Sequence, residues 1–410
     1  MNDVIIVGAG VCGLTLALAL HQRGIPCRVF ERAPSITELG VGITLLPHAM
    51  RELAALELDA ALLESGIENR ESAFFNRFGQ RIYGEPRGRF AGYPYPEIGI
   101  HRGRLQRLLY DAARARIGAQ RIVTDHQCVA VEQDEKGATV RFVETSSGHV
   151  LPPVRGSITV GCDGINSAVR KQYVPGDALA FAGINTWRGV TRRKRILDGR
   201  TYLRIGSILT GKMVIYPIVD DVDGSGDQLI NWVAEIKQEG YAQNDWNKPG
   251  RVEDFLPLYA SWTFDWLHVP ELIRSADQVL EYPMVDKDPL DRWTFGRVTL
   301  AGDAAHPMYP RGSNGSAQAI LDARALAECL EASSDAIAAL HAYEGRRLPP
   351  TSHVVRTNRE FPPDFINIKV EQLVGDRPFD DLDEYITQAE LAALSDEYKR
   401  IAGFAAPGAA

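Results

Sequence analysis

Residues 4–20 read VIIVGAGVCGLTLALAL, an apolar strand that runs into a glycine-rich turn and then into an apolar helix. Gly8 permits a tight turn, Gly10 lets a phosphate group approach the backbone, and Gly13 lets the helix pack closely on the strand. Glu31 lies at the end of the next apolar strand. Strand, turn, helix and acidic residue together predict a Rossmann-like βαβ unit that binds a dinucleotide.

The chemistry of this unit follows from its backbone. The free N–H groups and the positive dipole end of the first helix, predicted over residues 11–23, stabilise a pyrophosphate. The Glu31 carboxylate can accept hydrogen bonds from ribose hydroxyls, and it would repel a 2′-phosphate.

Composition limits the function classes that remain. A chain of 410 residues suggests two or three domains. The net charge of −8 argues against nucleic acid as a main partner, because phosphate backbones are bound by clustered Lys and Arg. The one basic run, residues 192–195, is interpreted as a solvated loop.

The cysteines and the hydropathy pattern point to the cytoplasm. The five cysteines are scattered without CxxC spacing, so we expect reduced, mostly buried thiols and no metal site. Residues 3–20 contain the glycine turn and lack a basic start, which disfavours a signal peptide. No other stretch is apolar for about 20 residues, so we expect no membrane partner.

The order of predicted elements indicates an α/β fold with an α+β substrate part, in which a Rossmann-like domain is interrupted by a β-sheet domain. Further strands are predicted at 122–124, 128–133, 138–144, 158–162 and 298–300, and helical stretches at 47–65, after 101–104 and at 316–332. The nucleotide-binding domain is assigned to 1–72, 98–180 and 276–360. The β-sheet substrate domain is assigned to 73–97 and 181–275, and residues 361–410 form acidic helical pieces and a tail, 405–410, expected to be disordered.

Two further motifs identify the family. Residues 161–170 read GCDGINSAVR, and residues 302–316 read GDAAHPMYPRGSNGS. With the N-terminal unit, these motifs make the chain resemble the class A flavoprotein aromatic hydroxylases, the p-hydroxybenzoate hydroxylase-like group, over essentially its whole length. Within that group it is most similar to phenazine-modifying monooxygenases, through GINTWRGV at 183–190, NWV at 231–233, DWN at 245–247 and YPMVD at 282–286.

The resemblance implies FAD as cofactor and assigns roles to matching positions. Gly302 and Asp303 would lie beside the ribityl chain, and Pro310 over the ring system. The turn from Gly312 through Asn314 and Gly315 to Ser316 would face the pyrimidine edge of the flavin, although Ser313 and Asn314 depart from the commonest family residues. Further cofactor contacts are implied for Val11, Cys12, Arg32, Val41, Gly42 and Cys128.

Two of the implied cofactor contacts have competing interpretations. Arg102 would reach the FAD phosphates, with Arg104 as the alternative. Asp163 would lie near the pyrophosphate, but it is alternatively a structural residue bonded to nearby backbone or to Arg170.

The family resemblance also implies the reaction. NADH or NADPH binds transiently to reduce the flavin, and the absence of a basic cluster for a 2′-phosphate favours NADH. Reduced FAD and O2 give a flavin C4a-hydroperoxide, which hydroxylates an electron-rich aromatic or heteroaromatic ring with or without decarboxylation. The expected partner is therefore a small aromatic substrate.

Catalytic candidates are few. Tyr216 and Arg204, on predicted sheet strands, and Tyr309, next to the flavin turn, could deprotonate a phenol or orient a carboxylate. His306 is interpreted as a packed histidine beside the cofactor rather than a base. Trp187, Trp232 and Trp246 would either contact a flat ligand or fill the sheet core.

Three alternative functions compete with aromatic hydroxylation. A flavin-dependent halogenase is disfavoured because Trp262, Trp266 and Pro270 have the wrong spacing for a WxWxIP segment. A decarboxylating, salicylate-type hydroxylase and a non-catalytic FAD-binding protein remain. The acidic C-terminal segment could supply a dimer contact or cover the nucleotide domain, so the chain is expected to be a monomer or a homodimer.

Overall fold

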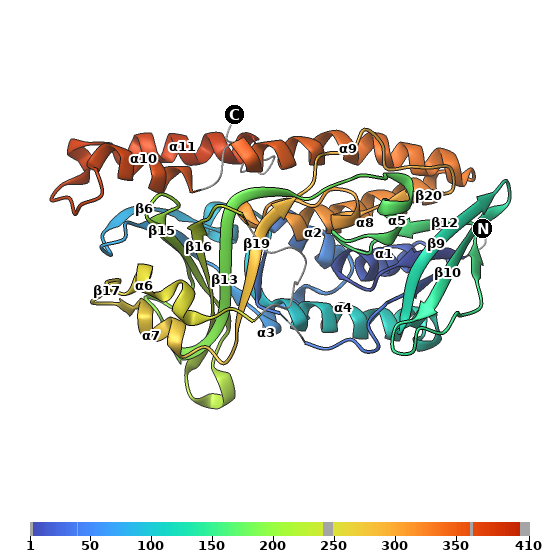
Figure 1. Cartoon of the computed structure of the whole chain (residues 1–410), viewed down its shortest axis with the longest axis horizontal. Helices are drawn as coiled ribbons and strands as arrows, with labels where there is room; N and C mark the ends of the chain where they lie inside the picture. Colours follow the sequence, from blue (N-terminus) through green and yellow to red (C-terminus); the bar gives the residue numbers. More distant parts are fainter. Residues whose placement is uncertain (1–2, 39, 241–248, 361–363, 402–410) are drawn as a thin grey trace.

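Two blocks of structure lie side by side, and a row of C-terminal helices runs along both of them (Figure 1). The computed structural model describes residues 3–38, 40–240, 249–360 and 364–401. The predicted tail and the segment 245–247 lie outside these residues.

The first block is built on a parallel sheet in the order β20-β12-β1-β2-β8. Its strands are β1 (Val4–Val7), β2 (Cys27–Phe30), β8 (Ile122–Val123), β12 (Ile158–Gly161) and β20 (Val298–Leu300). Every residue of β1, β12 and β20 is buried, as expected for parallel strands covered on both faces. Because the carboxyl ends of parallel strands share one edge, this order brings the three sequence motifs together.

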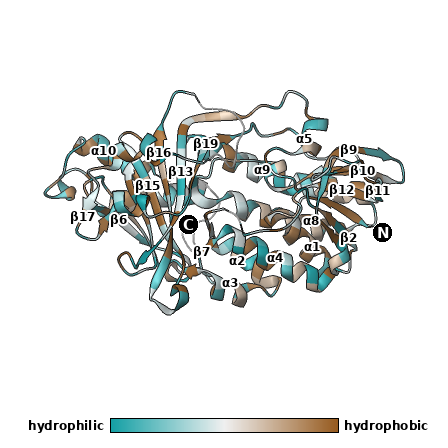
Figure 2. Ribbon diagram, turned by 60° about the horizontal axis from the view of Figure 1, so that its bottom comes forward, coloured by the Kyte–Doolittle hydropathy of each residue, from teal (hydrophilic) through white to brown (hydrophobic). Residues whose placement is uncertain are grey.

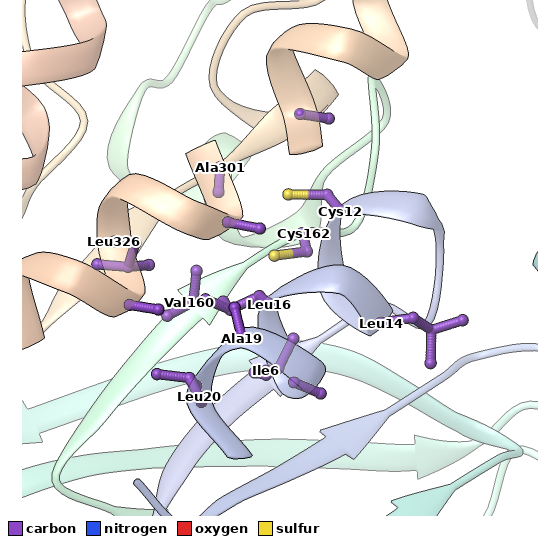
Figure 3. Packing of buried hydrophobic residues seen from close by; sticks show 14 of the residues in the cluster. Ile6, Cys12, Leu14, Leu16, Ala19, Leu20, Val160, Cys162, Ala301 and Leu326 are labelled. Atoms are coloured by element: carbon purple, nitrogen blue, oxygen red, sulfur yellow. The ribbon is translucent and has the colours of Figure 1, made fainter. Parts of the chain in front are cut away.

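Within the residues that the structure describes, six helices of the first block are packed on this sheet or beside it. They are α1 (Val11–Gln22), α2 (Pro47–Ala55), α3 (Asp59–Ser65), α4 (Arg102–Ile117), α5 (Ala168–Tyr173) and α8 (Gly315–Ala332). Leu16 and Leu20 of α1 lie among Ile6, Val160 and Leu326 in one apolar core (Figure 3).

Two small antiparallel sheets complete the first block, one beside the parallel sheet and the other against strand β15 (Gly211–Val219) of the second block. One has the order β11-β10-β9, and the other has the order β3-β7-β4. Their strands are β9 (His126–Asp134), β10 (Gly137–Glu144) and β11 (Val154–Gly156), and β3 (Gly42–Leu45), β4 (Ile67–Glu68) and β7 (Ile98–His101).

The second block is a seven-stranded sheet in the order β19-β13-β16-β15-β14-β5-β6. Neighbouring strands are antiparallel except for β14 and β5, which are parallel. The strands are β5 (Glu71–Phe75), β6 (Arg81–Pro86), β13 (Ala180–Lys194), β14 (Thr201–Ser207), β15 (Gly211–Val219), β16 (Asp227–Lys237) and β19 (Val279–Asp286). Brown hydrophobic and teal hydrophilic residues lie next to one another along this sheet (Figure 2).

The two faces of this sheet have different neighbours. One face packs against α6 (Leu256–Tyr259) and α7 (Val269–Arg274) through a core that includes Trp232 and Phe255. The other face looks toward the first block (Figure 1). A hairpin of β17 (Thr263–Phe264) and β18 (Leu267–His268) joins the two helices.

The C-terminal row consists of α9 (Ala336–Glu360), α10 (Phe365–Val374) and α11 (Gln388–Ile401). Helices α10 and α11 pack on β5 and β6 through Ile366, Val370 and Leu391. Short 3₁₀ turns lie at Gly88–Ala91, Ala119–Arg121, Val222–Gly224, Val252–Asp254, Gly302–Ala304, Arg311–Ser313 and Leu382–Glu384.

Three expectations from the sequence need correction. The helical stretch at 47–65 is two helices, because Glu57 has a positive φ of 58° and breaks it. Residues 192–194 end strand β13 and are not a loop, although Arg192 is exposed as expected. Helix α9 was not predicted, since Pro349 and Pro350 lie inside it and proline usually ends a helix.

The cysteines are mostly buried, as predicted. All five cysteines are unpaired, and four of them are buried. Among the described residues, no helix is long and apolar enough to cross a bilayer.

One buried arginine ties the second motif to the third. Arg170 is fully buried and binds both carboxylate oxygens of Asp177, at 2.8 Å each. It also donates to the backbone carbonyls of Ala304 and Ala305, at 3.2 and 2.8 Å. This single guanidinium therefore fixes the turn that follows β20.

We predict that Arg170→Met destabilises the protein by about 3–5 kcal/mol, because it leaves two buried carbonyls without their donor and leaves Asp177 with Lys287 as its remaining cationic partner. Urea unfolding of the purified protein measures the loss. Arg192→Met is the matched control, since Arg192 is an exposed arginine that also pairs with aspartates, and it should cost less than about 1 kcal/mol. Equal losses in the two variants would contradict the prediction.

Candidate functional site

The three glycines of the N-terminal turn differ in what surrounds them. Gly8 has φ +104°, and a Cβ atom there would lie 2.5 Å from the carbonyl oxygen of Cys162. A Cβ at Gly13 would lie 2.0 Å from the Gly8 oxygen, so α1 can approach β1 only with glycine. A Cβ at Gly10 would meet nothing within 4 Å. The protein thus encloses Gly8 and Gly13 but leaves open space beside Gly10 at the start of α1, where Val11 and Cys12 follow.

The Glu31 carboxylate lies at this same turn. It accepts from the backbone N–H of Ala9 at 2.7 Å and of Ala33 at 2.9 Å, and it remains partly exposed. Gln106 of α4 donates to the Ala9 carbonyl at 2.8 Å, a contact that the sequence analysis missed. The neighbouring Arg32 is exposed.

Arg102 and Arg104 differ in their surroundings. Arg102 begins α4, is exposed, and donates its backbone N–H to Val41 at 3.0 Å, next to Gly42. Arg104 lies 3.9 Å from Glu38. No carboxylate of the described residues is within ion-pair distance of Arg102, so its guanidinium is the one available to an anion.

Asp163 is already used by the protein. Its carboxylate accepts from the Ser167 hydroxyl at 2.5 Å and from the backbone N–H of Ala168 at 2.7 Å, and so holds the start of α5. Burial raises the pKa of Asp163, and these hydrogen bonds oppose that effect. Of the two interpretations, the contacts favour the structural one, with backbone as the partner and not Arg170.

The third motif presents one exposed carboxylate. Gly302, with φ +59°, is buried against Cys12, and Ala304 is buried, whereas Asp303 between them is exposed. An isolated exposed carboxylate at the end of a buried strand can accept hydrogen bonds from a hydroxylated ligand.

Asp322 of α8 binds the turn that contains Gly302 and His306. Its carboxylate accepts from the Gly302 N–H at 3.0 Å, from His306 Nε2 and from Arg347 Nε at 2.8 Å. Burial raises the pKa of Asp322, but the charges of His306 and Arg347 hold it below its ordinary value. His306 is therefore buried and is held through its Nε2 by Asp322.

The glycine-rich turn leads into α8. Pro310 is exposed, Gly312 has φ +68°, and the helix begins at Gly315 and Ser316. Asn314 is buried, its Oδ1 accepts from Gln318 at 3.2 Å, and its Nδ2 has no hydrogen-bond partner among the described residues. A buried, unpaired donor is costly, so this amide is suited to an acceptor on a ligand.

Cys128 lies on β9, near Asp163 of the second motif. It is buried, and burial raises the pKa of its thiol to about 12. The thiol is therefore neutral and acts as a small apolar group.

The sheet face that looks toward the first block carries charged and aromatic side chains. Across the strands, one row pairs Val190 with Asn231 and Asn231 with Tyr216, and the next row pairs Arg188, Val233, Val214 and Arg204. The following row pairs Thr186, Glu235 and Lys212. Asn231 Oδ1 accepts from the Gly42 N–H at 2.7 Å, so this face contacts the first block directly.

Tyr216 and Arg204 are brought together by a residue that the sequence analysis did not name. The ring of Tyr202 stacks on Tyr216 at 4.9 Å, and Arg204 lies 4.6 Å from the centre of the Tyr202 ring. Arg204 also donates to the Ser72 hydroxyl. Burial raises the pKa of Tyr216 far above its ordinary value, so its hydroxyl stays protonated.

Tyr309 is not part of this group. It packs with Ile184, Ile208 and Met284 near the edge strand β19. Burial, together with the charge of Asp286, raises the pKa of Tyr309 to about 12. Trp187 and Trp232 lie in the core on the opposite face, which decides their role in favour of packing.

Comparisons with known proteins agree with this geometry. A family described as "FAD binding domain" matches residues 1–194 and 273–358. The chain is 41% identical to a phenazine 1,6-dicarboxylic acid hydroxylase, PhzS, of Lysobacter antibioticus over 98% of this chain and 97% of the relative. It is 33% identical to a 3-amino-4-hydroxybenzoate 2-monooxygenase, PtmB3, of Streptomyces platensis over 87% of each chain. An HpxO variant of Klebsiella pneumoniae, solved with FAD, has the same fold with a TM-score of 0.75 at 24% identity, covering 98% and 97%.

The different surroundings of Gly10 and Gly13 generate a prediction. Gly10 has φ −77°, which valine can adopt, so Gly10→Val should leave the melting temperature of the FAD-free protein unchanged. Its side chain would fill the open space beside the turn and weaken FAD binding by about two orders of magnitude, or about 2.7 kcal/mol. Flavin fluorescence titration of the FAD-free protein measures the affinity.

Gly13→Ala should affect stability and not only FAD binding, because the alanine Cβ would clash with the backbone oxygen of Gly8. It should lower the melting temperature of the FAD-free protein itself. If Gly10→Val retains normal FAD affinity, the open space is not the pyrophosphate site.

Proposed function

The chain belongs to the FAD-binding family of class A aromatic monooxygenases, and we propose that it hydroxylates a planar, multi-ring aromatic carboxylate of the phenazine class. FAD is its cofactor, as in the other NAD(P)H-dependent flavoprotein monooxygenases of this family. The observation that carries the substrate proposal is the sheet face on which Arg204, Tyr202 and Tyr216 form one continuous stack.

The residues of the first block fit FAD. Open space at Gly10 suits the pyrophosphate, with Arg102 as the cationic partner and Glu31 as the acceptor for ribose hydroxyls. Asp303 suits the ribityl hydroxyls, and the unpaired Asn314 amide suits an acceptor on the pyrimidine edge. When bound, FAD supplies hydride acceptance from NAD(P)H and the activation of O2.

The sheet face supplies recognition of the substrate. Stacked tyrosines offer flat apolar area for an aromatic ring. Arg204 is buried and has no carboxylate partner among the described residues, so a substrate carboxylate would pair with it in a forked arrangement. The protonated Tyr216 hydroxyl would donate a hydrogen bond to the substrate and would not remove its proton.

Three further assignments complete the proposal. NADH is preferred over NADPH because no basic cluster for a 2′-phosphate stands out in the sequence. The unpaired cysteines suit a cytoplasmic enzyme that acts on a small aromatic substrate without nucleic-acid or membrane partners. The enzyme works as a monomer or a homodimer.

The proposal is tested by anaerobic stopped-flow reduction of the holoenzyme with NADH. We expect phenazine carboxylates to speed flavin reduction by orders of magnitude, and hydroxybenzoates to have a weaker effect because they cover less of the stack. Under air with ¹⁸O2, the product should carry one labelled oxygen, and its mass reports any loss of CO2. Equally slow reduction with every ligand would contradict the proposal.

The raised pKa of Tyr216 generates a pH prediction. Because burial keeps the phenol protonated as pH rises through about 10, this residue should not contribute to the alkaline limb of kcat/KM. Tyr216→Phe should therefore lower kcat/KM by about two- to tenfold through the lost hydrogen bond, with the shape of the profile unchanged up to about pH 9.5. A limb that disappears in the variant would identify Tyr216 as a titrating base.

A further inference from the structure

Two arginines of the sheet face, the buried Arg204 and the partly exposed Arg188, lack the carboxylate partners that other arginines inside the protein have. Arg170, Arg347 and Arg87 each bind at least one carboxylate. Arg188 and Arg204 have no carboxylate of the described residues within ion-pair distance. Burying an unpaired guanidinium is unfavourable, so these two positions call for an anion from outside the chain.

The contacts that Arg188 does make leave most of its donors free. Its Nε lies 3.4 Å from the Thr186 hydroxyl, and its guanidinium lies 5.4 Å from the centre of the Tyr282 ring. Burial lowers the pKa of Arg188, although the guanidinium stays charged. Arg204 is similar, with Ser72 as its hydrogen-bond partner and the Phe74 ring at 4.9 Å.

The charged groups nearest to Arg188 are engaged elsewhere. Glu235 is in the next row of the sheet, and its carboxylate binds Lys212 Nζ at 3.0 Å. Lys212 in turn pairs with Asp364 at 3.1 Å. Arg102 is the other nearby charge, and because it is also positive it makes the region more attractive to an anion.

Strand register places the two arginines in one straight row. Arg188 pairs with Val233, Val233 with Val214, and Val214 with Arg204. Three strand spacings of about 4.8 Å put the arginine Cα atoms about 14 Å apart. Between them the two valines form a flat apolar floor, and both Arg188 and Val233 remain partly exposed.

We infer that Arg188 and Arg204 are the two anchors of one flat ligand that carries an anionic group at each end. Each guanidinium would hold one carboxylate through N–H···O contacts of about 3 Å. The distance that remains between the two carboxylates is then about the length of a fused multi-ring system. This inference rests on the function proposed above and deepens it, because it assigns Arg188 as the residue that distinguishes dicarboxylate from monocarboxylate substrates.

The test compares three ligands on the oxidised holoenzyme: phenazine, phenazine-1-carboxylate and phenazine-1,6-dicarboxylate. Dissociation constants come from the change in flavin absorbance on titration, which does not require turnover. In the wild type the dicarboxylate should bind about 30-fold or more tightly than the monocarboxylate, since a buried forked contact to a second carboxylate is strong. In Arg188→Met this ratio should fall to about 1–3.

Arg193→Met is the matched control. Arg193 lies on the same strand but on the opposite face, and its Nε lacks a hydrogen-bond partner in the described part of the chain. The control should keep the wild-type ratio. Melting temperature and FAD content check that each variant is folded, and Arg188→Lys, which keeps the charge but loses the fork, should still reduce the ratio about three- to tenfold.

Each outcome has a defined meaning. A wild-type ratio near 1, or an unchanged ratio in either Arg188 variant, overturns the two-anchor inference while the proposed function stands. If none of the three ligands perturbs the flavin or speeds its reduction by NADH, the proposed function fails as well.

Discussion

The buried carboxylate of Asp322 is the interaction on which the cofactor side of this enzyme depends. It binds the Gly302 N–H, His306 and Arg347, and so connects the turn after β20 to α8 and α9. A buried carboxylate with three charge-assisted or backbone donors is rigid, because any displacement leaves a charge unpaired. Arg347 also binds Gln318, which donates to Asn314 at the flavin turn. Two separate parts of the third motif are thereby held by one network.

The same logic explains how three motifs far apart in sequence come to share one site. The parallel sheet brings the ends of β1, β12 and β20 to one edge. Arg170, reaching from α5 to the carbonyls of Ala304 and Ala305, then fixes the second motif against the third. What remains free at this edge are the groups that a cofactor needs: the space beside Gly10, the Asp303 carboxylate and the Asn314 amide.

Local signals in the sequence, the glycine turn between an apolar strand and an apolar helix, were sufficient for a dinucleotide-binding α/β fold. FAD and the monooxygenase family followed from the resemblance that the three motifs carry. The sequence was a weaker guide to the roles of side chains that depend on contacts with residues far away in the chain. The role of Asp163 depends on its contact with Ser167 and Ala168, and the stack of Arg204 on Tyr202 depends on which face each strand buries. Alternation along a strand predicts two faces but does not say which one meets the flavin block. The register that aligns Arg188 with Arg204 lies across four strands, where no local pattern records it.

The seven-stranded sheet assigns its two faces to opposite kinds of chemistry. One face is a conventional aromatic core, which includes Trp187, Trp232 and Phe255. The other carries the buried Arg204 and the partly exposed Arg188. Neither pairs with a carboxylate of the described residues, which lowers the stability of the ligand-free protein. An anionic ligand that pairs with these arginines removes the free-energy cost of leaving them unpaired. Affinity for the ligand and discrimination between ligands therefore arise from the same two side chains. The apolar floor of Val233 and Val214 would then select flat ligands, and the spacing of the arginines would select their length.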